Sequence, residues 1–420
     1  MKTRPLLQAT ACATLALCAA TASAAPIEIL FVGDSYTFGR VDPVMSYNAA
    51  NVHDLTAGFN AINPTGTNAF EPHPWGGVPG VFKEFTVEAG LDYDVSISAR
   101  NAASLRGQFL DTANTTWDMR GNVASKQWNV VVLQDLSDVS LPDGKGKNAN
   151  NAQFQAYVNQ FVQFIHDGAA QTYTETQLYG SLANCEATGL SKTSCGIKRV
   201  IPANANASAA TQVYLTETWA RPDMAFAHQL TTPDPASASG EPIVDTSSAG
   251  GDATLYYTSL GAMSADLHAA FAAVGQADTG LAGVIPVGDA FQLGVDEGSV
   301  KSSGFYDANG VFVPPQPGEP LDLWWDDGLH ASKYGSYLDA LVQFGTITGL
   351  DPLSLGANES AAQSLGISST DALFLERLAA EDLGMSLSAV PEPGNAGLMA
   401  AALAGLACLA RRRGRAREHA

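Results

Sequence analysis

Short apolar runs rich in β-branched residues alternate with longer amphipathic segments along most of the chain. Five such runs predict strands, at residues 27–32, 93–98, 128–133, 213–216 and 283–287. Apolar positions at helical spacing predict helices at 154–165, 262–274 and 332–347. Strands that alternate with helices favour an α/β fold, in which a parallel sheet is covered by helices on both faces.

Two stretches interrupt this alternation and are expected to be insertions. One is residues 141–151, rich in Gly, Lys and Asn, and the other is about 171–210. Residues 351–389 predict a small helical tail. Because no clear linker divides the chain, we expect residues 25–350 to form one domain with insertions.

The N-terminus has the order of parts of a secretory signal peptide. Lys2 and Arg4 precede an apolar run, which ends in the small residues Ala22-Ser23-Ala24. This run is too short to remain as a membrane-spanning helix. We therefore expect signal peptidase to remove residues 1–24 from an exported protein.

The C-terminus carries a second targeting pattern, in residues 390–420. Pro391-Glu392-Pro393 precedes the uncharged apolar segment 394–410, and an arginine cluster begins at Arg411. The segment has the minimum length for a membrane-spanning helix, with the arginines on the cytoplasmic side. This order resembles the PEP-CTERM sorting signal of Gram-negative bacteria. The resemblance implies transient membrane anchoring and cleavage by an exosortase; a plain C-terminal anchor is the alternative. Both place the body in the cell envelope or outside the cell.

Charge and cysteine content narrow the function further. The chain has 42 acidic and 22 basic residues and a net charge of −20, so we expect no nucleic-acid partner. Of five cysteines, only Cys185 and Cys195 lie between the two targeting segments. In an oxidising compartment they are expected to form a disulfide. No CxxC motif or His/Cys cluster indicates a metal, and no cofactor is expected.

A serine follows the first predicted strand in the motif Gly33-Asp34-Ser35. Ligands of open parallel sheets bind at the carboxyl ends of strands, near the switch in strand order. A serine there is accessible to substrate, and its own N–H can face a reacting carbonyl. The alternative is a strand-end turn in which Asp34 or Ser35 caps a helix.

An acid and a histidine stand three residues apart near the end of the body, in Asp327-Gly328-Leu329-His330. With Gly328 permitting a tight bend, the Asp327 carboxylate can reach one imidazole nitrogen while the other nitrogen faces a serine. His330 would then act as general base for Ser35. The alternative is a surface loop in which His330 merely lies beside acids.

These two motifs, in this order, resemble those of the SGNH/GDSL hydrolase family. The resemblance spans residues 27 to about 350. It implies a flavodoxin-like three-layer α/β/α sandwich of about five parallel strands. It also implies ester hydrolysis through an acyl-enzyme, with Ser35, His330 and Asp327 as the catalytic triad.

The middle motifs of the family are less well matched. The family places a glycine after the second strand and an asparagine after the third, and both help to bind the oxyanion. Here residues 100–104 contain no glycine, so the backbone N–H of Ala102 or Ala103 is the expected donor. Gln134 is the candidate side-chain donor after the third strand, or else a brace of its loop, and Asn101 competes with it.

Trp219 and Arg221 follow the fourth predicted strand and should face the same crevice. They either line a substrate cleft or anchor their loop to the core. Together these observations predict an exported serine esterase, with acylated extracellular polysaccharide as the favoured substrate and deacetylation as the reaction. The alternatives are a lipase, a phospholipase or an O-acyltransferase on the same triad, or a non-enzymatic matrix or polysaccharide-binding protein.

Overall fold

The computed structural model describes residues 25–58, 71–113, 117–234, 240–244, 253–277 and 280–385. The predicted signal peptide, the predicted sorting tail and residues 386–389 lie outside this set, so the targeting predictions stay predictions. No helix in the described ranges is both long and apolar enough to cross a membrane.

A sheet of six parallel strands forms the centre of the molecule, in the order β10-β7-β4-β1-β3-β2. The strands are β1 (Ile27–Gly33), β2 (His53–Asp54), β3 (Tyr93–Ala99), β4 (Val130–Leu133), β7 (Gln212–Thr216) and β10 (Gly283–Ile285). The five predicted strands correspond to β1, β3, β4, β7 and β10. The fifth ends earlier than predicted, because Val287 begins a helix.

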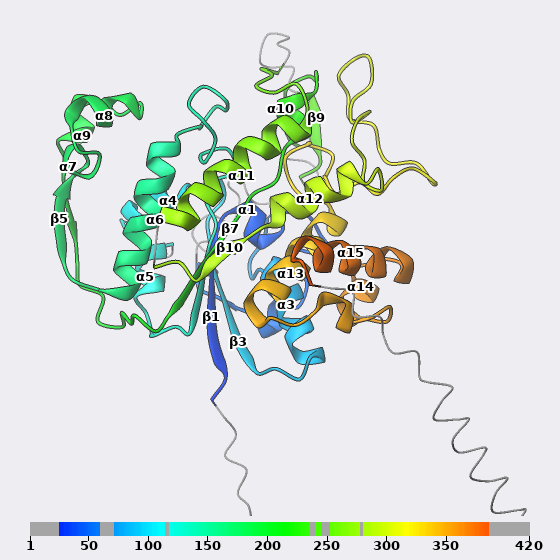
Figure 1. The fold of residues 1–420 in the computed structure, drawn as a ribbon, viewed down its shortest axis with the longest axis horizontal. Coiled ribbons are helices and arrows are strands. Elements are labelled where there is room, and N and C mark those ends of the chain that lie inside the picture. The colour runs from blue at the N-terminus through cyan, green and yellow to red at the C-terminus, as the bar shows by residue number, and fades with distance from the viewer. Residues whose placement is uncertain are drawn as a thin grey trace, which may run out of the picture.

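Helices cover both faces of this sheet, which confirms the predicted three-layer α/β/α sandwich (Figure 1). On one side α13 (Lys333–Thr348) packs against α3 (Gly77–Glu88) and α15 (Ser369–Asp382), and Phe85 of α3 meets Tyr337 of α13 edge to face. On the other side aromatic rings of α6 (Asn151–His166) contact α4 (Leu105–Leu110) and α11 (Leu260–Ala277), with Phe161 against Phe109 and Phe154 against Phe271.

The bounds of these helices are as follows. The long ones are α3 (Gly77–Glu88), α6 (Asn151–His166), α11 (Leu260–Ala277), α12 (Val287–Asp296), α13 (Lys333–Thr348) and α15 (Ser369–Asp382). The short ones are α1 (Ser35–Phe38), η1 (Ala49–Asn51), α4 (Leu105–Leu110), α5 (Met119–Val123), α10 (Pro222–Ala225), η2 (Pro352–Ser354) and α14 (Ser360–Ser364). The last three elements of the chain, η2, α14 and α15, occupy most of the predicted helical tail.

The central strand β1 is apolar from Ile29 onward because both of its faces are covered there. Leu30, Phe31 and Val32 are all buried. Full burial of each such side chain contributes roughly 1.5–3 kcal/mol to stability. On one side Gly33 of β1 pairs with Ala99 of β3, and on the other Val32 pairs with Leu133 of β4. The loops that follow these three strands therefore meet at one edge, where the strand order switches sides at β1.

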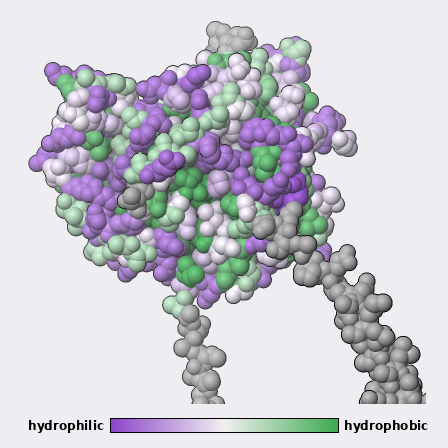
Figure 2. Space-filling view, viewed as in Figure 1, coloured by the Kyte–Doolittle hydropathy of each residue, from purple (hydrophilic) through white to green (hydrophobic). Residues whose placement is uncertain are grey.

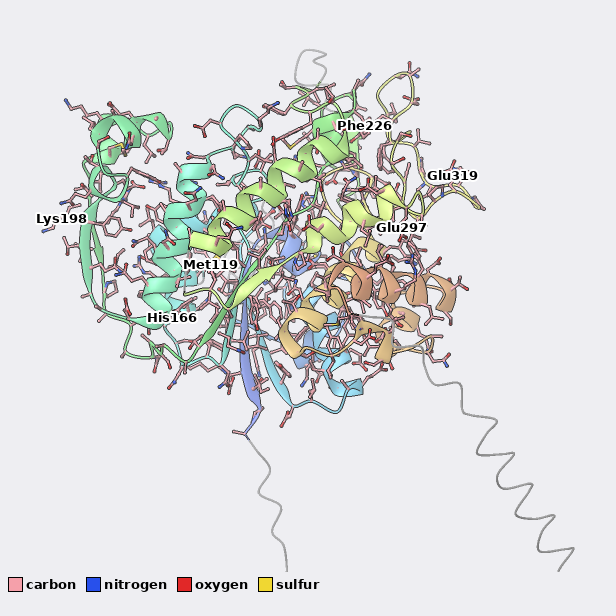
Figure 3. All side chains as sticks on the ribbon, in the orientation of Figure 1. Met119, His166, Lys198, Phe226, Glu297 and Glu319 are labelled. Atoms are coloured by element: carbon pink, nitrogen blue, oxygen red, sulfur yellow. A yellow bond between two sulfur atoms is a disulfide. The ribbon has the colours of Figure 1, made fainter. Side chains whose placement is uncertain are left out.

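The second predicted insertion forms an arm that projects from the body (Figure 1). Its antiparallel strands are β5 (Gln171–Thr174) and β6 (Lys198–Ile201), and between them lie α7 (Glu175–Leu178), α8 (Leu182–Ala187) and α9 (Lys192–Cys195). A disulfide joins Cys185 to Cys195, as predicted, and Figure 3 shows it on the same arm as Lys198. The buried Glu175 carboxylate pairs with Arg106 of α4 and Arg199 of β6, which fixes the arm to the body.

A second hairpin lies near the carboxyl edge of the sheet. It consists of β8 (Thr231–Pro233) and β9 (Pro242–Val244), which pair antiparallel. Polar side chains cover most of the face seen in Figure 2, with apolar groups in small separate patches. Scattered apolar groups of this kind are normal for a protein surface.

Candidate active site

Ser35, His330 and Asp327 come together at the carboxyl end of β1. His330 Nε2 lies 2.8 Å from Ser35 Oγ, and His330 Nδ1 lies 2.6 Å from Asp327 Oδ2. Ser35 and His330 are only 5% and 3% exposed. The two imidazole nitrogens thus face different partners, which is the arrangement a general base needs.

The loop that holds Asp327 and His330 is bent by its own hydrogen bonds. Asp327 Oδ1 accepts the backbone N–H groups of Leu329 and His330, each at 2.9 Å. Gly328 has a φ of 65°, and a Cβ at this position would lie 2.0 Å from the Tyr306 hydroxyl. Glycine is therefore required at this bend, and one Asp327 oxygen fixes the loop while the other contacts the imidazole.

Gln134 supports the segment around Ser35 through hydrogen bonds. Its Oε1 accepts the Asp34 N–H and the Thr37 hydroxyl, each at 2.9 Å, and its Nε2 donates to the Asp135 carbonyl. A Cβ on Gly33 would lie 2.0 Å from Thr37 Oγ1 and 2.5 Å from Gln134 Oε1, so glycine makes room for this network. Of the two roles considered for Gln134, these contacts favour the brace.

Replacing Gln134 with alanine is expected to lower stability more than catalysis. The change leaves the Asp34 N–H and the Thr37 hydroxyl without their buried acceptor, at about 1–3 kcal/mol for each donor. We expect kcat per folded molecule to fall less than ~10-fold, whereas loss of an oxyanion donor costs ~10²-fold or more. Thermal unfolding and kinetics of Gln134→Ala and Asn101→Ala, measured on the same preparations, check this. A large loss of kcat with unchanged stability in Gln134→Ala would restore the donor role.

Two backbone N–H groups are available to donate hydrogen bonds to an oxyanion. Ser35 is the first residue of α1, where a helix leaves its N–H without an intrahelical acceptor. Ala102 has a φ of 52°, in the left-handed region that favours glycine, and no hydrogen bond within the described ranges engages its N–H. The Ala103 N–H already donates to the Arg100 carbonyl. Since such strain persists mainly at functional positions, Ala102 is the stronger candidate of the two alanines.

Trp219 is buried behind the triad and does not border open space. It is 1% exposed and stacks between Tyr36, at 3.9 Å between ring centroids, and Phe291, at 4.8 Å. Its indole N–H and the Tyr36 hydroxyl both donate to the Leu329 carbonyl. The contacts favour anchoring of the loop over lining of a cleft, and they hold the residue next to His330 in place.

Arg221 is also committed to internal contacts. Its guanidinium makes two hydrogen bonds to the Asp223 carboxylate and a third to the Ser137 hydroxyl. Its side chain is 12% exposed. Arg221 therefore positions Asp223, and Asp223 is the residue of this pair that borders a cavity.

A cavity of about 230 Å³ opens beside the triad. Asp327, Trp325, Arg40, Asp223 and His228 line it together with the β8–β9 hairpin. A second cavity, of about 290 Å³, shares Trp325 and continues past Asp326. Trp325 lines both cavities, each of which mixes charged with apolar side chains, and Asp327 lines the first.

Arg40 brings a positive charge close to the triad. Its guanidinium lies 3.9 Å from Asp327 Oδ2 and 3.4 Å from His330 Nδ1, and it pairs with Glu71 at 2.9 Å. Burial alone would raise the pKa of Asp327, but His330 and Arg40 outweigh burial and hold that pKa at about 2. Burial lowers the pKa of His330, although Asp327 opposes the shift. The site thus contains a charged Asp327 and a neutral imidazole at neutral pH.

The pKa of His330 sets the expected pH dependence. Because the base must be unprotonated, kcat/KM should rise with pH and level off, with a midpoint below the ordinary value of 6.5. Burial raises the pKa of the neighbouring Asp34 to about 7, so Asp34→Asn is the control that removes the step which Asp34 itself would add. Steady-state kinetics across the acid and neutral pH range measure this midpoint for the wild type and for Asp34→Asn. A midpoint above that of a free imidazole in Asp34→Asn would contradict the proposed base.

Four residues of the site carry no signal in the sequence. Tyr36 and Arg40 follow Ser35 closely, but their contacts with the Asp327–His330 loop depend on the fold. Glu71 and Trp325 likewise reach the site only through packing, as partners of Arg40.

The fold and site together define an α/β/α protein with a Ser-His-Asp chain of contacts at the switch point of its sheet. No family model matches the chain, and the search of curated proteins found no match. Among solved structures, a candidate SGNH hydrolase from Slackia heliotrinireducens is similar over 77% of this chain and 100% of its own, at 14% identity and a TM-score of 0.37.

Two other solved structures show comparable similarity. A DUF4886 family protein from Bacteroides uniformis covers 87% of this chain and 98% of its own, at 10% identity and a TM-score of 0.40. The structure of TesA covers 77% and 98%, at 11% identity and a TM-score of 0.34. Similarities this distant carry no weight for function, which is argued below from the geometry of the site.

Proposed function

We propose that this protein is a serine esterase of the SGNH/GDSL type, with Ser35, His330 and Asp327 as its catalytic triad. The observation that carries the proposal is the chain of contacts from Asp327 through His330 to Ser35. These residues lie on loops 295 positions apart in sequence, yet meet at the edge where parallel sheets bind ligands.

The proposed reaction follows from the positions of these groups. Ser35 Oγ attacks the ester carbonyl while His330 Nε2 takes its proton, and Asp327 stabilises the imidazolium that forms. The N–H groups of Ser35 and Ala102 hold the oxyanion. His330 then protonates the leaving alcohol, and an acyl group remains on Ser35. Water, activated by His330, releases the acid and restores the enzyme.

An acylated saccharide is the substrate class that we propose for this site. Trp325 lines two neighbouring cavities in which charged and polar groups are mixed with apolar ones, which suits a hydroxyl-rich ring stacked on an indole. Asp223 and Asp326 offer acceptors for hydroxyl groups, and the negative charge of the chain disfavours anionic substrates. The targeting segments predicted from the sequence agree with a polymer outside the cytoplasm, reached through signal peptidase and exosortase processing.

Acyl-chain preference and acceptor use distinguish the rival activities. We expect acetylated oligosaccharides and p-nitrophenyl acetate to be hydrolysed, and p-nitrophenyl palmitate to be a poor substrate. Preference for the long acyl chain would support a lipase or phospholipase, and transfer of acetyl to an added sugar would support an acyltransferase. Failure of a fluorophosphonate probe to label Ser35 would favour a non-enzymatic binding protein.

Replacing Trp325 with alanine tests the saccharide directly. We expect kcat/KM for an acetylated oligosaccharide to fall about 2- to 12-fold, since aromatic stacking contributes about 0.5–1.5 kcal/mol beyond burial. The small ester p-nitrophenyl acetate should be hydrolysed at nearly the original rate. Trp128→Phe, a change at a buried tryptophan far from the triad in the fold's core, is the control for general destabilisation. Equal losses on both substrates would contradict a sugar-binding role.

A further inference from the structure

A second group of polar side chains gathers at the end of β7, apart from the triad. Glu217 directly follows this strand, His268 lies on α11 and Asp289 lies on α12. Each offers one ligand atom, and these atoms all lie within 4.8 Å of one another. His268 Nδ1 and Asp289 Oδ2 are 2.8 Å apart.

Glu217 is the member of this group whose burial is not explained by its hydrogen bonds. Its residue is 1% exposed, and its Oε1 has no hydrogen-bond partner within the described ranges. A buried carboxyl oxygen without a partner is costly, and natural proteins rarely keep one without a reason. Gly288 of α12 approaches this segment closely, because a Cβ there would lie 2.2 Å from the Thr218 carbonyl oxygen and 3.2 Å from Glu217 Oε1.

The surroundings of this group lack a compensating cation. The charges of Asp289 and of Asp382, on α15, both act on Glu217, and Asp382 Oδ2 is itself buried without a partner. Among the ion pairs of the described residues, none joins Glu217, Asp289 or Asp382 to a lysine or arginine. A bound cation would give the unpaired Glu217 oxygen a partner and would offset the three neighbouring carboxylates.

We propose that Glu217, His268 and Asp289 bind a divalent transition-metal ion of the Zn²⁺ type. Two carboxylate oxygens and one imidazole nitrogen form a ligand set that suits Zn²⁺, whereas Ca²⁺ and Mg²⁺ prefer oxygen ligands alone. Zn²⁺ needs ligand distances of about 2.0–2.2 Å, so the side chains close in slightly around the ion. His268 and Asp289 are 61% and 31% exposed and have room to move, and water fills the remaining position.

The role of this ion is structural, because it joins segments that are distant in the chain. It connects the end of β7 to α11 and α12. Trp219, two residues after Glu217, packs against Tyr36 behind the triad. The proposal is independent of the esterase assignment, since neither the triad nor its cavity includes any of the three ligands.

The sequence offers a matched control for this site. His53 and Asp94 form another surface pair 2.8 Å apart, with side chains 63% and 31% exposed. They lack a third ligand, since the group around Glu217 is the one cluster of metal-ligand type found in the described ranges. His53→Ala therefore removes an equivalent histidine without touching the proposed site.

Titration of the chelator-treated protein with Zn²⁺ by calorimetry tests the proposal. We expect one equivalent to bind and to raise the melting temperature, because a ligand that binds only the folded state stabilises it. His268→Ala should weaken binding at least ~100-fold, more than the ~10–100-fold typical of changes around a metal site. His53→Ala should bind like the wild type, and so should Ser35→Ala.

Glu217→Gln provides a second, shape-preserving test. The carboxamide fills the same volume but binds metal poorly, so the variant should fold and lose the Zn²⁺-dependent rise in melting temperature. Absence of stoichiometric Zn²⁺ binding by the wild type would overturn the proposal. Binding that survives both His268→Ala and Glu217→Gln, or that weakens equally in His53→Ala, would also overturn it.

Discussion

Ser35→Ala is expected to lower kcat/KM for p-nitrophenyl acetate by at least ~10³-fold, as loss of a triad member does. The substitution removes the attacking oxygen and leaves His330 without a nucleophile to activate. Labelling by a fluorophosphonate probe should disappear with it. The fold should be little affected, because one hydroxyl is lost at the start of a short helix, and thermal unfolding checks this.

Ser194→Ala is a suitable control for that experiment. Ser194 lies on α9 of the projecting arm, where its hydroxyl contacts only Ser191. This variant should retain full activity and labelling. If Ser35→Ala kept the wild-type rate and the probe still reacted, another residue would be the nucleophile, and the esterase assignment would have to be abandoned at this site.

Asp327→Asn should have an effect of similar size, about 10⁴-fold on kcat, for a geometric reason. The Asp327 oxygen that accepts two backbone N–H groups dictates how an asparagine must sit. Its carbonyl takes that position, and its NH₂ group then faces His330 Nδ1. The imidazole must accept there, so its proton moves to Nε2 and it can no longer take a proton from Ser35.

The neighbouring Asp326 supplies the matched control. It is the same residue type one position earlier, but burial raises its pKa, whereas that of Asp327 is lowered, and it borders the second cavity instead of the imidazole. Asp326→Asn should change kcat for a small ester less than ~10-fold, within what loss of a nearby charge produces. Steady-state kinetics of Asp327→Asn and Asp326→Asn test this prediction. Equal losses of kcat in the two variants would show that Asp327 acts through its net charge only.

The fold could be predicted from the sequence because its strands are buried on both faces and therefore read as apolar runs. The sixth strand escaped prediction because His53–Asp54 is too short to show a period. The motifs around Ser35 and His330 were visible for a related reason. Each combines a glycine needed at a tight bend with chemically distinctive side chains in a few consecutive positions.

The remainder of the site depends on contacts that no local pattern encodes. The left-handed backbone conformation of Ala102 could not be predicted from the sequence. A glycine at this position would have indicated a positive φ, but an alanine does not. The use of Gln134 as an acceptor emerged only from its neighbours Asp34 and Thr37. Trp219 was equally compatible with a cleft or a core until its stacking on Tyr36 was known.

The separation of nucleophile and base along the chain has a consequence for biosynthesis. Ribosomes make Ser35 early and His330 some 295 residues later, so every shorter nascent chain contains the serine without its base. β1 also needs β3 and β4 on either side before its carboxyl end becomes part of a crevice. If Ser35 and His330 act as proposed, reactivity arrives only with the completed fold, and a molecule truncated before His330 should not hydrolyse esters.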